Sequence, residues 1–132
     1  MAKPTSRSTQ RTSVASWFHV AVAGLAGRWR RFAIADHSMR PTLQDGDWIL
    51  GIAHPKRIRV GDVIVCDLPG REGFSIVKRV ETIDSVSRAL WVVGDDPAAG
   101  SVDSRSFGAI PMAAITARVL LRYRPLPPTL IR

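Results

Sequence analysis

The chain has 132 residues, a length that suits a single folded domain. Its composition, 45% hydrophobic and 23% charged, is that of a globular protein and excludes a chain that is disordered throughout. The net charge of +8 comes mainly from residues 1–31, which hold six Lys or Arg and no acid, whereas residues 32–132 hold thirteen basic and eleven acidic residues. A charge concentrated in one tail is not typical of a DNA-reading face, so we expect no nucleic-acid partner.

The N-terminal part divides into two segments. Residues 1–13 are polar, basic and poor in large apolar side chains, so we expect a disordered basic tail. Residues 14–27 are apolar and lead into the basic run at residues 28–31. Three interpretations of the segment 14–31 stay open: a membrane anchor, an interfacial helix with its aromatic residues at the headgroup level, or a helix docked on the domain.

The length of the apolar segment argues against a full membrane span. Fourteen residues rise about 21 Å as a helix, against a hydrocarbon core of about 30 Å. Extending the segment to residue 34 would bury three arginines, each unfavourable by roughly 3 kcal/mol at the bilayer centre. We therefore expect peripheral attachment to a membrane surface, with a cytoplasmic location as the alternative.

The residues from Phe32 onward are typical of a β-rich domain, which we place at residues 32–128. Short runs rich in β-branched residues are separated by turn residues about every ten positions. The fold class that we expect is mainly β, with antiparallel sheets folded over one another and a short N-terminal helix in front. The predicted strands are residues 48–53, 60–68, 74–83, 89–94 and 115–124.

Metal and cysteine chemistry find little support in the sequence. Cys66 is the single cysteine, and its place in the apolar run GDVIVC indicates a small buried hydrophobic side chain. The histidines, His19, His37 and His54, have no ligand-like spacing to one another or to Cys66. We expect no metal and no cofactor.

A serine nucleophile would need a neutral base within hydrogen-bond reach. His37 directly precedes Ser38, but neighbours in an extended chain point to opposite faces. The nucleophile-elbow motif GxSxG is also absent from the sequence. A Ser-His-Asp triad is therefore disfavoured.

Lysine is the other candidate base. In the predicted strand 74–83, period-two alternation places Lys78 on one face with Phe74, Ile76 and Val80, whereas Arg79 faces the other way. Burial among such side chains would lower the pKa of the lysine, so that its neutral amine could accept a proton. Taken alone, a lysine in an apolar row more often extends to solvent than it catalyses.

Four segments, read in order, resemble the signal peptidase I family. They are HSMRPTL at 37–43, GDVIV at 61–65, IVKRV at 76–80 and GDDPAAGSVDSRSFG at 94–108, and RVLLRYRPLP at 118–127 is similar to that family's closing strand. A set of motifs in the same order is far more specific than any single match. The resemblance implies the β-rich catalytic core of the signal peptidase I and LexA-like type.

The resemblance also implies a serine endopeptidase that removes a leader from a precursor protein by cleaving after small residues. Carried over by position, Ser38 is the nucleophile and Lys78 is its general base. Ser101 would orient the Lys78 amine, while Asp103 and Arg105 would form a structural ion pair behind the dyad.

Two positions beside the nucleophile depart from the family pattern. Asp36 stands where a Ser, Thr or Gly is common, and His37 stands where glycine is usual. An ionised carboxylate cannot donate a hydrogen bond into the oxyanion hole. We therefore expect either that Asp36 turns away or that the hole relies mainly on the Ser38 backbone N–H. The last motif also has one residue more than its commonest form.

The spacing indicates a compact member of the family, since only fifteen residues separate Lys78 from Gly94. Compact versions resemble the mitochondrial inner-membrane proteases and the bacterial proteases that mature nickel-type superoxide dismutase, and the C-terminal RVLLRYRPLPP favours the latter. Two alternatives stay open. One is a self-cleaving LexA-like regulator, which would need a DNA-binding domain ahead of Ser38, and the other is a catalytically impaired relative that only binds.

Overall fold

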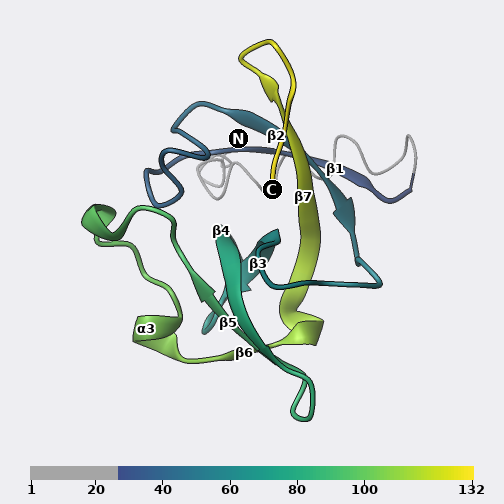
Figure 1. The fold of residues 1–132 in the computed structure, drawn as a ribbon, viewed down its shortest axis with the longest axis vertical. Helices are drawn as coiled ribbons and strands as arrows, with labels where there is room; N and C mark the ends of the chain where they lie inside the picture. The colour runs from purple at the N-terminus through teal and green to yellow at the C-terminus, as the bar shows by residue number, and fades with distance from the viewer. Residues whose placement is uncertain (1–26) are drawn as a thin grey trace, which may run out of the picture.

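The computed structural model describes residues 27–132, which form one antiparallel sheet that folds over itself (Figure 1). The strand order is β1-β2-β7-β3-β4-β5-β6, and β8 pairs with β7. This confirms the mainly β fold class. In chain order the elements are β1 (Trp29–Ala33), β2 (Trp48–Ala53), β3 (Val63–Leu68), β4 (Arg71–Asp84), β5 (Ala89–Val93), η2 (Pro97–Ala99), α3 (Ser104–Phe107), β6 (Ile110–Pro111), η3 (Met112–Ala114), β7 (Ile115–Arg124) and β8 (Thr129–Leu130).

The predicted strands all exist, and β2 and β7 have the predicted bounds. Strand β3 begins three residues later than predicted, whereas β4 is longer at both ends because it pairs with β3 along one part and with β5 along another. The predicted tail, residues 1–13, and the N-terminal helix within 14–26 lie outside the described residues. Within residues 27–132 no helix has the length and apolar character needed to cross a membrane.

The first strand corrects one part of the sequence interpretation. The sequence pattern places residues 29–31 in the apolar and basic segment 14–31, whereas the structure has them begin β1, which pairs with β2 from Trp29↔Ile52 to Ala33↔Trp48. The physical reason is Phe32, which is buried in the core and carries its neighbours into the sheet as alternating outward-facing residues. The sheet also continues past residue 128, because β8 follows it.

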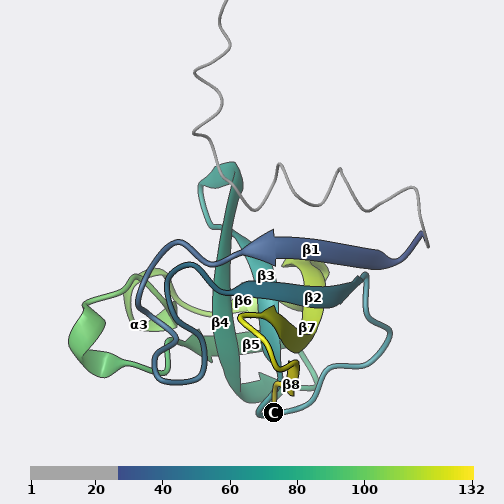
Figure 2. The ribbon, with the colours of Figure 1, turned by 90° about the horizontal axis from the view of Figure 1, so that it is seen from above.

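Strand β3 separates two hydrophobic cores. Its side chains alternate between the two faces, so Val63 and Val65 join one cluster, whereas Ile64 and Cys66 join the other. Burial on both faces explains why the run VIVC is continuously apolar instead of alternating with polar residues. Figure 2 shows the resulting arrangement, in which β1 and β2 run crosswise to β4.

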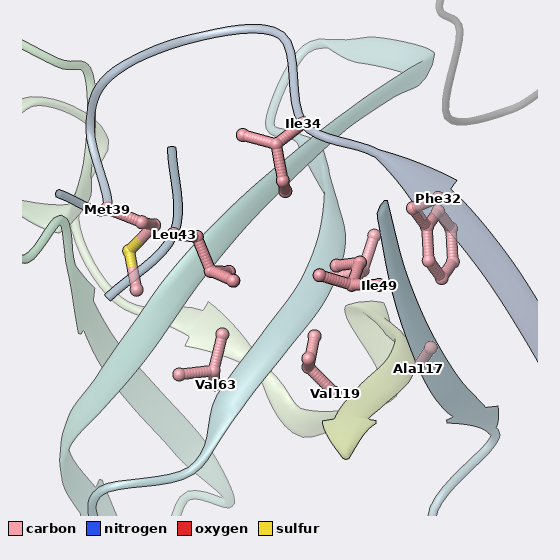
Figure 3. Close-up of a cluster of buried hydrophobic side chains, with 9 residues drawn as sticks. Phe32, Ile34, Met39, Leu43, Ile49, Val63, Ala117 and Val119 are labelled. Atoms are coloured by element: carbon pink, nitrogen blue, oxygen red, sulfur yellow. The ribbon is translucent and has the colours of Figure 1, made fainter. Parts of the chain in front are cut away.

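The first of these cores anchors the segment that carries Ser38. Figure 3 shows Met39 and Leu43 directed into the same cluster as Ile49, Val63 and Val119. Both side chains are almost fully buried, which fixes the loop between β1 and β2 at two points within five residues after Ser38. The second core contains Ile64, Cys66, Val80, Leu90, Val92, Ile110 and Ile115.

Candidate active site

Ser38 lies in the loop of residues 34–47, which joins β1 to β2. The loop closes at its base, where the Ile34 N–H donates to the Asp47 carbonyl at 2.8 Å and the Gly46 N–H donates to the Ile34 carbonyl at 2.8 Å. The Leu43 N–H donates to the Met39 carbonyl at 2.8 Å, forming one tight turn after the serine. Ser38 itself is 2% exposed. The sequence therefore folds this loop around two buried apolar anchors and leaves the serine beside them.

Lys78 lies in the middle of β4, opposite Ile64 of β3, and is also 2% exposed. The predicted apolar face is present at Val80, which is buried, and at Ile76, which packs against the second core. Phe74, in contrast, is 39% exposed and contacts the Arg71 guanidinium, which lies 4.3 Å from its ring centroid. Burial lowers the pKa of Lys78, and the carboxylates of Asp36 and Asp103 only partly oppose this effect.

Gly94 lies against two of the predicted residues, Ser38 and Ser101. The register pairs Arg79 with Val93, so one step further along the same antiparallel register Lys78 comes opposite Gly94. A Cβ atom added to Gly94 would lie 2.8 Å from the Ser38 carbonyl oxygen and 2.9 Å from Ser101 Oγ. The structure thus brings Ser38 and Ser101 together at one glycine whose missing side chain makes room for them, and the register places the Lys78 backbone on the neighbouring strand.

Asp103 supports this glycine from behind. Its carboxylate, 1% exposed, accepts hydrogen bonds from the Gly94 N–H at 3.1 Å and the Arg105 N–H at 3.0 Å. The Arg105 guanidinium donates to both carboxylate oxygens, at 3.1 and 2.5 Å, so the ion pair expected from the sequence is present. The side-chain hydrogen bond from Arg105 is the main reason that the pKa of Asp103 is lowered from 3.8 to about 2.

Sequence reasoning missed a second ionic network that ties the Ser38 loop to β4. The Arg79 guanidinium donates to both carboxylate oxygens of Asp95, at 2.7 and 2.8 Å, and the Thr42 hydroxyl donates to Asp95 at 2.6 Å. Burial alone would raise the pKa of Asp95, but the hydrogen bonds from Arg79 and Thr42 lower it overall. Arg79 is the one feature of the sequence that could have indicated this network. An arginine on the strand face opposite Lys78 requires an acidic partner when it is half-buried.

The residue after Asp95 also holds the loop. The Asp96 N–H donates to the Ser38 carbonyl at 2.9 Å, and the Asp96 carboxylate pairs with Arg40 at 2.9 Å. Further along the chain, the Ser104 hydroxyl accepts the Val92 N–H at 2.9 Å and ties α3 to β5. These contacts fix the end of β5 against the serine loop.

The sequence leaves two possibilities for Asp36, and the first is that its side chain turns away from Ser38. The structure shows the opposite. Its Oδ1 atom accepts the Ser38 hydroxyl at 3.2 Å and the Ser38 backbone N–H at 3.3 Å. The second possibility is an oxyanion hole that relies on the Ser38 backbone N–H, but in this structure that N–H donates to Asp36. His37, next to it, is exposed on the loop.

The remaining candidate chemistry is limited. Cys66 is fully buried, as the sequence indicated, and desolvation is the main reason that its pKa rises to about 12, so the thiolate is not accessible near neutral pH. Across residues 27–132 no group of three or more His, Cys, Asp or Glu side chains is arranged as metal ligands.

Comparison with known proteins finds one matching family and two named relatives. The family described as "Signal peptidase, peptidase S26" matches residues 9–85, which include Ser38 and Lys78. Mitochondrial inner membrane protease subunit 1 of Xenopus tropicalis is 34% identical over 110 residues, covering 67% of this chain and 65% of that protein. The Schizosaccharomyces pombe protein of the same name is 34% identical over 111 residues, covering 68% of this chain and 70% of its own length. The chain thus spans just under two thirds of the frog protein.

Proposed function

The chain belongs to the signal peptidase family, peptidase S26, and on this premise we propose that it is a serine endopeptidase with a Ser38–Lys78 dyad that removes an N-terminal leader from a precursor protein. One observation carries the proposal. A buried serine lies against Gly94, and a buried lysine with a lowered pKa lies on β4, the strand that pairs with β5 just before this glycine. A neutral amine beside a serine hydroxyl is the pair that this chemistry needs.

The proposed reaction has two halves. In acylation, Ser38 Oγ forms a bond to the scissile carbonyl carbon while the neutral Lys78 amine takes the hydroxyl proton, and the carbonyl electron pair moves onto its oxygen. The C–N bond then breaks, and the Lys78 ammonium gives its proton to the leaving amine. In deacylation, water attacks the ester carbonyl and passes a proton to Lys78, which returns it to Ser38 as the acid leaves.

The supporting residues have positioning roles in this proposal. Ser101 Oγ, which lies near Gly94 as the Ser38 carbonyl does, would hold the Lys78 amine in the rotamer that faces the serine. The ion pair of Asp103 with Arg105 would keep the Gly94 backbone in place through the Gly94 N–H. Precise placement of reacting groups accounts for a large share of catalytic rate.

The proposed substrate is a precursor with small residues before the cleaved bond, and nickel-type superoxide dismutase is the first candidate. The compact core supports a dedicated processing protease, because β4 and β5 are joined by a short turn with no insertion between Lys78 and Gly94. Both curated relatives are named as inner membrane proteases, which supports attachment of this chain to a membrane as part of the proposal. We propose peripheral attachment in a bacterial cell through residues 14–28.

Incubation of the purified full chain with candidate precursors tests this function directly. New N-termini are mapped by mass spectrometry, and we expect a single cut after a small residue. Ser38→Ala should remove the cut, whereas Ser85→Ala, at an exposed serine in the β4–β5 turn, should leave it unchanged. A cut that persists in Ser38→Ala would overturn the proposal.

A catalytically impaired relative is the second candidate, and the contact between Asp36 and Ser38 favours it. Such a protein would bind precursors through the same site without cutting them. Co-sedimentation of a precursor with wild-type protein, without any new N-terminus, is the result that this alternative predicts.

A further inference from the structure

A single carboxylate oxygen accepts hydrogen bonds from two groups of the proposed nucleophile, its hydroxyl and its backbone N–H. Asp36 Oδ1 accepts the Ser38 hydroxyl at 3.2 Å and the Ser38 backbone N–H at 3.3 Å. In acyl transfer the hydroxyl proton must pass to the base, and the N–H of the nucleophile is a natural donor to the developing oxyanion. Both groups are therefore directed at Asp36 in this structure, and neither is free for the reaction.

The charge of Asp36 adds to this effect. An ionised carboxylate only accepts hydrogen bonds, so it competes with a substrate carbonyl oxygen for the Ser38 N–H and repels the negative charge that develops there. Asp36 also acts on Lys78, because it is the foremost of the charges that favour the ammonium form. Of the other groups that act on Lys78, Asp103 acts in the same direction, Cys66 does so only where its thiol is ionised, and Arg105 opposes them.

The backbone around Asp36 allows its carboxylate to leave without loss of the fold. Residues 35–37 are exposed, whereas Ser38 and Met39 are buried and hold the loop to the first core. Rotation of the Asp36 side chain into solvent would therefore expose the Ser38 hydroxyl and N–H while the serine keeps its place.

We infer that Asp36 is a built-in inhibitory ligand of Ser38, which holds the position of the oxyanion until a substrate carbonyl displaces it. This inference rests on the proposed function and adds a residue that sets its rate. Removal of the carboxylate, or its replacement by a hydrogen-bond donor, should make the protein a faster protease. Such an effect is the opposite of what loss of an orienting residue would produce.

The test compares Asp36→Ser and Asp36→Asn with the wild type and with Asp45→Asn, which removes one exposed carboxylate from the same loop. A fluorogenic peptide with alanine before the cleaved bond reports kcat and KM, and p-nitrophenyl acetate with intact-mass analysis reports acylation of Ser38. We expect both Asp36 variants to raise kcat and the acylation rate at least about tenfold, since a single oxyanion donor is worth about 10² to 10³ in kcat. Asp45→Asn should match the wild type.

The pH dependence gives a readout that a purely structural role would not move. Because Asp36 favours the charged form of Lys78, Asp36→Ser should shift the rise of kcat/KM to lower pH. Asp36 variants that acylate no faster than the wild type, including no acylation of either, would overturn the inference. The Ser38→Ala substitution in each background separates the two ideas, since cleavage that persists there contradicts the dyad, whereas Ser38-dependent cleavage at an unchanged rate contradicts only the role of Asp36.

Discussion

The two members of the proposed dyad are held by different kinds of structure. Lys78 lies within a strand that pairs with β3 on one side and β5 on the other, so the sheet fixes its backbone. Ser38 lies in an irregular loop, where single contacts decide the surroundings of its carbonyl, N–H and hydroxyl. The comparison teaches that the base is set by the fold as a whole, whereas the nucleophile can be tuned by one nearby side chain.

The largest effect is expected from replacing Lys78, the member of the dyad that the sheet holds. Lys78→Met should lower kcat by about 10³-fold or more, because the two members of a dyad act as a unit. The fold should survive, since methionine fills the same space and removes the cost of a buried amine. Thermal unfolding should therefore show equal or higher stability beside the lost activity. Activity that survives in this variant would show that Lys78 is not the base.

The pH profile of the same reaction identifies the base without a substitution at Lys78. Burial lowers the pKa of Lys78, and the neutral amine is the active form, so kcat/KM should rise with pH through that lowered pKa. Since a histidine titrates near 6.5, the variants His37→Gln and His54→Gln serve as controls and should keep the rise. Loss of the rise in either variant would assign the base to that histidine.

Much of the lysine side could be predicted from the sequence, because strands follow a regular alternation. The period of two placed Lys78 on an apolar face and Arg79 on the other, and both assignments agree with their burial and contacts. Phe74 lies on the same predicted face but is exposed, as are all of residues 71–74 beside the β3–β4 turn, and alternation carries no information about where a core ends.

The serine side and the first strand could not be predicted in the same way. A loop has no period, so the direction of the Asp36 carboxylate depends on hydrogen bonds that form only after folding. The sequence does not distinguish strand β1, because its composition, with Trp29 and two arginines, matches a membrane-surface segment as well as an edge strand. The network of Asp95 depends on partners far apart in the chain, which no local pattern connects.

Two glycines allow the contact between Gly94 and the Ser38 loop to be tested against a matched control. A Cβ atom at Gly94 would meet the Ser38 carbonyl oxygen at 2.8 Å, and a Cβ atom at Gly51 would meet the Arg118 carbonyl oxygen at the same distance. Each alanine substitution should cost about 1 to 3 kcal/mol of stability through overpacking. Gly94→Ala should in addition lower kcat by about 10²-fold, because it displaces the serine backbone.

Measurements of unfolding and kinetics on both glycine variants decide this point. The expected result is a similar loss of stability with a loss of rate at Gly94→Ala alone. If Gly51→Ala lowers kcat as much, the effect is general destabilisation, and Gly94 has no special place between the serine and the lysine.

The smallest expected effect concerns Asp103, which supports Gly94 from the lysine side. The pKa of Asp103 falls from 3.8 to about 2 on folding, chiefly through the Arg105 hydrogen bond, so the folded state favours the ionised carboxylate. This stabilisation is complete above about pH 4 and is lost as the pH falls toward 2. Asp103→Asn should therefore be less stable by about 1 to 2 kcal/mol at pH 7, the usual cost of losing a charge-assisted hydrogen bond in a buried site.

Urea unfolding from pH 7 to pH 2 tests this account, because an asparagine does not ionise. Between about pH 4 and pH 2 the wild type should lose stability faster than Asp103→Asn, so the two curves approach each other at the acid end. Arg105→Gln should move the loss to higher pH, since the guanidinium is the main cause of the lowered pKa of Asp103. Curves for the wild type and Asp103→Asn that run parallel over this range would show that the ion pair does not support the fold beneath Gly94.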